Sequence, residues 1–245
     1  MSEEKLESLG SIPNINDIHA MFFDMDDTLV KYREPVLAGF ESIREIVPEM
    51  KDTTAEEMEE QFRKLFTFDP VFRKEISYKD DVNARIGEIL NSHGKNVSDA
   101  ELKHFSGVFW RAFWKKRRMV DGAKDLLQMC KTKNIPVAII TNGNPQIQFR
   151  TMIRLRLHDF VDVILTPRNA EELKPNPLLF MKAMNLFNVG PEGVVMVGDS
   201  ISSDIKGAIN SGIVPIWFNN SKRNKPGDVE VAEVESFSEL VNIIR

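Results

Sequence analysis

The chain has 245 residues, of which 28% are charged and 42% hydrophobic, with a formal net charge of −5. This length and apolar content suit one large domain, or a core domain with a smaller one inserted. The mild acidity gives no reason to expect nucleic acid or an acidic membrane as a partner, and no apolar stretch is long enough to span a bilayer. The polar first nine residues lack the apolar segment of a secretory signal, so a cytoplasmic location is expected.

The cysteine and histidine content excludes several kinds of site. Cys130 is the only cysteine, which rules out an intrachain disulfide and a cysteine-based zinc site. The four histidines (His19, His93, His104 and His158) are scattered and form no helical HxxxH pair. Each is more typical of a surface or locally hydrogen-bonded residue than of a metal ligand.

The first predicted strand carries an acidic motif at its end. Residues 1–18 are expected to form a loosely ordered leader, and Ala20–Phe23 is typical of a buried strand. The sequence Asp-Met-Asp-Asp-Thr follows at 24–28, where this strand should emerge. Clustered carboxylates repel one another and therefore indicate a bound cation or a catalytic use, and an oxygen-only ligand set suits Mg²⁺. Taken alone, the motif is also compatible with an acidic turn.

The next segment, residues 33–118, shows helical periodicity only. Apolar residues repeat at helical spacing, and capping boxes begin at Thr54 and Ser98. The pattern predicts four amphipathic helices that form a small bundle. The basic run 115–118, which ends this segment, is expected to be a solvated hinge, with attraction of an anionic substrate as the alternative.

Beyond Val120 the pattern alternates. Helices are expected over 122–133, 145–155, 177–187 and 203–211, strands over 135–140, 160–165, 194–197 and 214–218, and a last helix begins near Ser236. Apolar strands that alternate with amphipathic helices imply a parallel sheet covered on both faces. The predicted fold class is therefore α/β, with a discontinuous Rossmann-like core (1–32 and 119–245) into which the four-helix domain (33–118) is inserted.

Polar residues stand at the ends of three predicted strands. They are Asp24 and Asp26 after the first, Thr141 and Asn142 after the next, and Asp199 after a later one. Ligands of such sheets bind at the carboxyl ends of the strands. This convergence favours a functional site over a simple acidic turn.

These motifs resemble a known family. In order, Asp24–Thr28, Ile140–Gly143, Leu173–Pro175 and Gly198–Asp204 are similar to the four signature motifs of the haloacid dehalogenase superfamily, and the resemblance extends from about residue 18 to the end. The helical insertion is similar to that family's mobile cap of the first type. Members that cleave carbon–halogen bonds typically lack the second aspartate of the first motif, so Asp26 favours phosphoester chemistry.

The resemblance assigns the chemical roles. Asp24 is expected to attack phosphorus and form an aspartyl phosphate, while Asp26 protonates the leaving group and later activates water. Thr141, Asn142 and Lys174 are expected to bind the phosphoryl group. Asn144 and Pro145 begin the following helix, which would turn N–H groups towards this anion.

The resemblance also implies a Mg²⁺ site. The expected ligands are Asp24, Asp199 and the backbone carbonyl of Asp26. Thr28 and Asp204 are expected to lie directly behind these ligands, where Asp204 would act on the metal through water or through another residue.

The predicted function is a Mg²⁺-dependent phosphatase for a small phosphorylated metabolite. Residues 141–143, 174–177 and 216–220 are similar to members that act on nucleoside monophosphates or sugar phosphates. Three alternatives remain: a phosphotransferase or mutase that uses the same aspartyl phosphate, a carbon–halogen hydrolase, which Asp26 disfavours, and a catalytically silent binding module. Neither the natural substrate nor the oligomeric state follows from the sequence.

Overall fold

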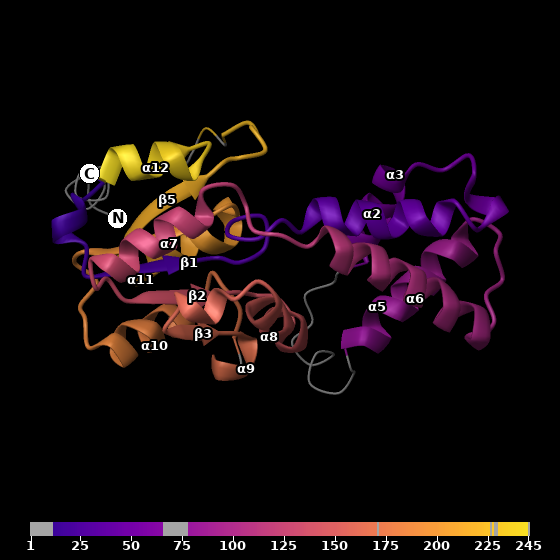
Figure 1. Cartoon of the computed structure of the whole chain (residues 1–245), viewed down its shortest axis with the longest axis horizontal. Coiled ribbons are helices and arrows are strands. Elements are labelled where there is room, and N and C mark those ends of the chain that lie inside the picture. Colours follow the sequence, from indigo (N-terminus) through magenta and orange to yellow (C-terminus); the bar gives the residue numbers. More distant parts are fainter. Residues whose placement is uncertain (1–11, 66–77, 171, 226, 228–229, 245) are drawn as a thin grey trace. The chain divides into compact units, whose positions relative to one another are not determined.

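The computed structural model describes residues 12–65, 78–170, 172–225, 227 and 230–244 (Figure 1). The chain divides into two compact units, which are described separately: one runs up to Val30 and resumes at Met119, and the other is Lys31–Arg118. None of the helices in the described ranges has both the length and the apolar character needed to cross a bilayer.

The first unit is built on a parallel sheet. Its strands are β1 (Ala20–Phe23), β2 (Val137–Ile140), β3 (Val163–Leu165), β4 (Val194–Gly198), β5 (Val214–Phe218) and β6 (Ala232–Val234). They lie in the order β3-β2-β1-β4-β5-β6, and every neighbouring pair is parallel. The central strand β1 pairs with β2 on one side and β4 on the other, so the carboxyl ends of these three strands meet at the point where the strand order reverses. This is where a ligand site is expected in such sheets.

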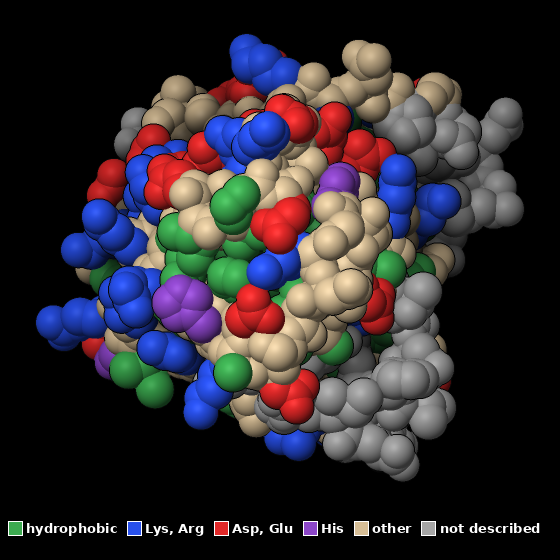
Figure 2. Space-filling view, turned by 90° about the vertical axis from the view of Figure 1, so that its right-hand side faces the viewer, with side chains coloured by type: hydrophobic (Ala, Val, Ile, Leu, Met, Phe, Trp, Pro, Cys, Tyr) green, Lys and Arg blue, Asp and Glu red, His purple; other side chains and the backbone are tan. Residues whose placement is uncertain are grey.

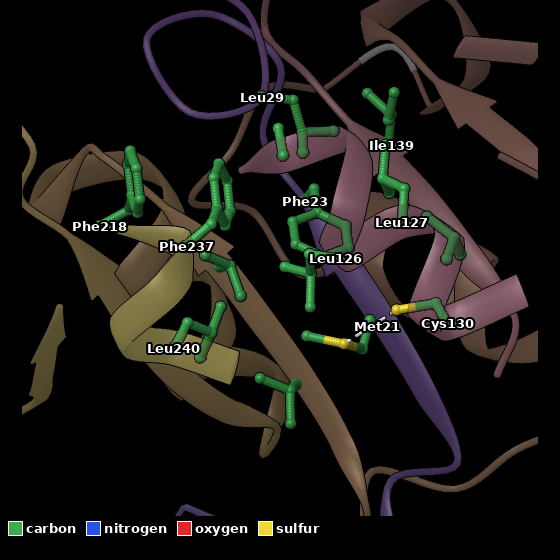
Figure 3. Packing of buried hydrophobic residues seen from close by; sticks show 14 of the residues in the cluster. Met21, Phe23, Leu29, Leu126, Leu127, Cys130, Ile139, Phe218, Phe237 and Leu240 are labelled. Carbon is green, nitrogen blue, oxygen red and sulfur yellow. Dashed lines mark hydrogen bonds between the residues drawn. The ribbon is translucent and has the colours of Figure 1, made fainter. Parts of the chain in front are cut away.

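Alternation along β1 explains why both faces of the sheet are covered. Met21 and Phe23 pack in one apolar cluster with Leu126 and Cys130 of α7 (Ala123–Thr132), as Figure 3 shows. Leu240 of α12 (Phe237–Ile244) belongs to the same cluster.

The opposite face of β1 presents Ala20 and Phe22. These pack with Phe180 of α10 (Leu178–Phe187) and Ala208 of α11 (Lys206–Ser211). Successive side chains of a strand point to opposite faces, so a strand covered on both faces must be apolar throughout. The predicted α/β class and two-sided sheet are thus confirmed.

Several element boundaries differ from the prediction. Residues 1–11 of the predicted leader lie outside the described residues. The last part of the leader is not loose, because Ile15 in η1 (Ile15–Asp17) and Ile18 both pack in the core. The strand predicted at 160–165 is shorter, since η3 (Leu157–Asp159) takes up the preceding chain. The edge strand β6 was not predicted, because it is only three residues long and contains Glu233.

The remaining helices of this unit each begin a few residues after a strand ends. They are α8 (Pro145–Arg154), α9 (Pro167–Ala170) and the π-helical turn η4 (Ile201–Ile205), which leads directly into α11. Asn144 caps α8 by accepting the N–H of Gln146, and Pro145 occupies the first helical position, as predicted.

The second unit contains the helices α2 (Arg33–Arg44), α3 (Ala55–Lys64), α5 (Tyr78–Ser92) and α6 (Asp99–Lys116), together with the short turn η2 (Pro48–Met50). Both predicted capping boxes are present, at Thr54 and at Ser98. Helices α2 and α6 approach closely at Gly39, where a Cβ atom would lie 2.4 Å from the ring of Phe109. A bare backbone at this position is therefore required for the aromatic core of the unit.

The surface of the second unit carries interspersed charges. Figure 2 shows acidic and basic side chains mixed over one face, around a small hydrophobic area. Lys95, for example, pairs with Glu101 at 3.0 Å and with Glu49 at 3.8 Å.

The predicted solvated character of 115–118 is wrong for Arg117. This side chain is 3% exposed and lies over the Tyr32 and Phe113 rings, where it donates to the carbonyl of Lys31. Its planar guanidinium can stack on aromatic rings, as the ammonium group of a lysine cannot.

Candidate active site

The end of β1 fixes the position of Asp24. The backbone N–H of Asp24 donates to the carbonyl of Val197 on β4 at 3.0 Å, so the sheet pairing extends to this residue. Its side chain is 8% exposed. Asp27 then adopts a left-handed backbone conformation with φ of 58°, and the N–H of Val30 returns to the carbonyl of Met25. The acidic motif is thus a tight loop over the strand end.

Lys174 joins two carboxylates at the centre of the site. Its Nζ lies 2.7 Å from Asp24 Oδ1 and 2.7 Å from Asp204 Oδ1, and it also donates to the carbonyl of Ile140. The lysine is 3% exposed, whereas a lysine with no buried partner normally reaches solvent. The ammonium group is therefore held by acceptors from the ends of β1 and β2 and from η4.

Asn142 holds the backbone on which Lys174 stands. Its Oδ1 accepts the N–H of Lys174 at 2.9 Å, and its Nδ2 donates to the carbonyl of Lys174 at 3.0 Å. The side-chain amide of Asn142 is thus committed to Lys174. The contact of Asn142 with the phosphoryl group, through a backbone donor, stays a prediction.

Asp199 follows β4 and is fixed from three sides. Its N–H donates to Thr28 Oγ1 at 3.0 Å, and its carbonyl accepts from Nε1 of the buried Trp217 at 2.9 Å. Arg223 donates to that same carbonyl and, at 3.0 Å, to Asp199 Oδ2. Thr28 thus supports the backbone of Asp199, while its role behind a metal ligand stays a prediction.

Asp204 is fully buried beside Gly198. A Cβ atom at Gly198 would lie 2.4 Å from Asp204 Oδ2, so this close approach needs a glycine. Besides the contact with Lys174, Asp204 Oδ1 accepts from Ser203 Oγ and Oδ2 accepts the N–H of Ser200. Both oxygens are therefore engaged within the protein, which suits a supporting role rather than direct contact with a ligand.

The electrostatics of the cluster favour a bound cation. Burial raises the pKa of Asp24 well above the ordinary range, Lys174 opposes this shift, and Asp204, Asp199 and Asp26 add to it. Burial, together with Asp204, raises the pKa of Asp199 to about 7, against the opposing effect of Arg223. These shifts show that the carboxylates repel one another in a poorly solvated space.

Lys174 answers this negative charge only in part. Burial alone lowers the pKa of Lys174, but the carboxylates of Asp204 and Asp24 raise it above its ordinary value, so the side chain stays protonated. Oxygens of Asp24, Asp199 and Asp204 lie within 4.8 Å of one another. When ionised, Asp24, Asp26, Asp199 and Asp204 together with the cations Lys174 and Arg223 leave an excess of two negative charges. Oxygen donors with such an excess fit a hard divalent cation.

Asp26 lies on another side of the loop, against α8. Its Oδ2 accepts from Gln148 Nε2 at 2.7 Å. The same Nε2 lies 3.4 Å from Thr141 Oγ1, which also accepts the N–H of Gly143 at 3.0 Å. Thr141 keeps its own O–H to donate. The structure thus brings Asp26 and Thr141 together through a residue that the sequence analysis did not select.

Gln148 and Arg223 are the contacts that sequence reasoning missed. Gln148 is a polar residue of α8 and so gives no sign of burial by itself. Its i, i+3, i+4 spacing with Thr151 and Met152, which are buried with it, is the signal that could have indicated a buried position. Arg223 lies in a polar loop 24 residues after Asp199 and has no sequence signal of its own. The buried Asn219 fixes this loop, because its side chain exchanges hydrogen bonds with the backbone N–H and C=O of Arg223.

Comparison with known proteins identifies the family. The family model for haloacid dehalogenase-like hydrolases matches residues 18–212. The chain belongs to this family. It is therefore an enzyme of the hydrolase class, as the motifs predicted.

Named relatives and solved structures agree with this assignment. The chain is 31% identical over 210 residues to a glyceraldehyde 3-phosphate phosphatase of Pyrococcus furiosus, with 84% of this chain and 82% of the relative covered. It is 26% identical to a ribulose-1,5-bisphosphate 5-phosphatase of Halopiger xanaduensis, covering 84% and 86% of the two chains. A dehalogenase crystal structure with an intermediate complex matches with a TM-score of 0.75 at 19% identity, covering 93% of this chain and 97% of that one. These relatives support the predicted phosphatase class, and the solved structure supports the fold.

Proposed function

We propose that the chain is a Mg²⁺-dependent phosphatase that hydrolyses a small phosphomonoester through an aspartyl phosphate on Asp24. The observation that carries this proposal is the buried Lys174, held 2.7 Å from both Asp24 and Asp204, with Asp199 completing an acidic cluster. A carboxylate kept beside a fixed ammonium group is suited to attack an anionic phosphoryl group, because the ammonium offsets the charge that would repel the substrate.

Asp24 and Asp26 divide the chemistry. Lys174 binds Asp24 Oδ1, so Oδ2 is the oxygen proposed to form the new bond to phosphorus as the ester P–O bond breaks. Asp26 gives its proton to the departing alkoxide. It then takes a proton from the water that attacks the phosphorus of the aspartyl phosphate, which releases inorganic phosphate and restores Asp24. Because the leaving alkoxide needs this proton and a halide does not, Asp26 also argues against the carbon–halogen alternative.

Asp24, Asp199 and the backbone carbonyl of Asp26 are the proposed metal ligands, with Thr28 and Asp204 supporting them. A bound Mg²⁺ would neutralise charge on the phosphoryl oxygens and orient them for in-line attack. Thr141 is proposed to donate its hydroxyl to the phosphoryl group, and the loop from Asn142 its backbone N–H groups. The unit Lys31–Arg118 is proposed to be the cap that sets specificity.

The substrate class is proposed to be a sugar phosphate or related small metabolite. Relatives named as phosphatases of glyceraldehyde 3-phosphate and ribulose 1,5-bisphosphate match this chain over most of its length, and a pyrimidine 5'-nucleotidase of Escherichia coli matches at 30% identity over 67% of it. Their substrates share a phosphomonoester on a small polar carbon skeleton. No single substrate is favoured among them.

The test compares wild type with Asp24→Asn on a generic aryl phosphate and then on a panel of phosphorylated metabolites. We expect Mg²⁺-dependent phosphate release by wild type, loss of turnover in Asp24→Asn, and a phosphorylated protein trapped by acid quench in wild type only. Asp125→Asn, an exposed acidic residue on α7, is the matched control and should behave as wild type. Equal turnover by wild type and Asp24→Asn would contradict the proposal. Transfer of the phosphoryl group to a sugar acceptor, in place of free phosphate, would favour the phosphotransferase alternative.

A further inference from the structure

Gln148 is a buried polar side chain whose position calls for an explanation. It lies in the first turns of α8, is 1% exposed, and donates from Nε2 to Asp26 Oδ2 at 2.7 Å. Its Oε1 is buried and has no hydrogen-bond partner among the described residues. A buried amide that is only partly paired destabilises a fold relative to an apolar side chain of the same size. Packing alone would therefore favour leucine or methionine here.

The chain also leaves room for this amide. A Cβ atom at Gly143 would lie 1.8 Å from Gln148 Nε2, so any side chain at 143 would displace the amide from its present place. The backbone of Gln148 is fixed by the first turn of α8, because its N–H donates to the carbonyl of Asn144 at 3.0 Å. A carboxylate accepts and does not donate, so the contact with Asp26 requires the NH₂ end of the amide to face it.

We infer that Gln148 is a positioning residue for Asp26, whose carboxyl group it holds in the orientation needed for proton transfer to the leaving group. This inference rests on the proposed function and adds a residue to it. The hydrogen bond from Gln148 Nε2 to Asp26 Oδ2 stops the carboxyl group from rotating. Precise orientation of an acid is part of what makes proton transfer efficient.

The leaving group provides a readout that a purely structural role would not change. An alkyl phosphate expels a strongly basic alkoxide and needs the acid, whereas a 4-nitrophenyl phosphate expels a weakly basic phenolate and hardly needs it. The ratio kcat/KM covers the steps up to phosphorylation of Asp24, and is therefore independent of the later attack by water.

The experiment compares Gln148→Met with wild type on both esters. Methionine has a similar length without the donor, so we expect kcat/KM for the alkyl ester to fall ~10- to 100-fold, a fraction of what general acid–base catalysis supplies. The value for the aryl ester should change less than about threefold. Gln148→Asn keeps the amide but is one methylene too short to reach Asp26, and should show the same selective loss of kcat/KM on the alkyl ester. It serves as the second variant if Gln148→Met does not fold.

The other outcomes separate the inference from the proposed function. An equal loss on both esters, or no loss, would overturn the role of Gln148. Asp26→Asn tests the function itself and should show the same selective loss to a greater degree. If Asp26→Asn loses activity selectively on the alkyl ester and neither Gln148 variant does, only this inference fails. If wild type hydrolyses neither ester, the proposed function fails and the inference falls with it.

Discussion

Replacement of Lys174 by methionine tests the electrostatic design of the site. The side chain is 1% exposed and its Nζ contacts two carboxylates at 2.7 Å, so the variant would leave Asp24 and Asp204 buried without their cation. Removing one partner of a buried ion pair costs about 3–5 kcal/mol, because the remaining charge is poorly solvated. In a metal chelator at about pH 8 we therefore expect the free energy of unfolding to fall by roughly this amount.

The pH dependence of that loss gives the prediction its sign. Without Lys174 the pKa of Asp24, already raised by burial, rises further, so the folded state holds a proton more tightly than the unfolded state. Stability is then lost as the pH rises through the folded-state pKa and is regained as the pH falls. The deficit of Lys174→Met should be smaller at about pH 5.5 than at about pH 8. Saturating Mg²⁺ should raise the free energy of unfolding of the variant above its value in chelator, since a ligand at ~100 times its Kd stabilises by about 2.7 kcal/mol.

The measurement is urea unfolding followed by circular dichroism, with and without Mg²⁺. Lys222→Met is the matched control, because Lys222 also pairs with a carboxylate at 2.8 Å but is 74% exposed. Exposed pairs contribute little to stability. If Lys174→Met were as stable as Lys222→Met in the chelator at the higher pH, the buried ammonium would not be compensating the acidic cluster.

Three further outcomes are expected. Burial raises the pKa of Asp199 to about 7, above its value in the unfolded chain. The free energy of unfolding of the metal-free protein, measured in urea, should therefore fall as the pH rises towards 8. Asp199→Asn should make this dependence on pH weaker. Because Arg223 lowers the pKa of Asp199, Arg223→Ala should make Mg²⁺ affinity, measured by calorimetry, fall more steeply with decreasing pH. Unchanged steepness would refute this. Ser98→Ala removes the cap of α6 and should destabilise the helical unit by about 1 kcal/mol in thermal unfolding, with activity on an aryl phosphate retained.

The fold could be predicted because each element has a local signal. Strand β1 is apolar at every position, and Asn144 with Pro145 marks the start of α8 in the sequence and in the structure. Such signals depend on neighbours a few residues away. They fail where tertiary packing decides, as at β6, whose three residues pair along β5, and at Arg117, whose side chain lies over the ring of Tyr32.

The sequence indicates which strand ends meet at the site, but not which of the side chains there pair with one another. Strand ends place Asp24, Thr141 and Asp199 at one edge of the sheet, which the order of the motifs already indicates. The partners of each side chain lie far away in the sequence: Gln148 is 122 residues from Asp26, and Lys174 is 150 residues from Asp24. No local pattern specifies which of several polar side chains will meet across that distance.

Several of these pairings join a side chain to the backbone of another segment. The side chain of Asn142 binds the backbone of Lys174, that of Thr28 binds the N–H of Asp199, and that of Trp217 binds the carbonyl of Asp199, so residues from one segment of the site hold the backbone of another. Groups fixed in this way need little reorganisation when charge develops on a phosphoryl group, which is the usual source of electrostatic catalysis. The same rigidity keeps the carboxylates close although they repel one another. The site therefore stores an unfavourable interaction in the metal-free protein, and the proposed divalent cation would relieve it on binding.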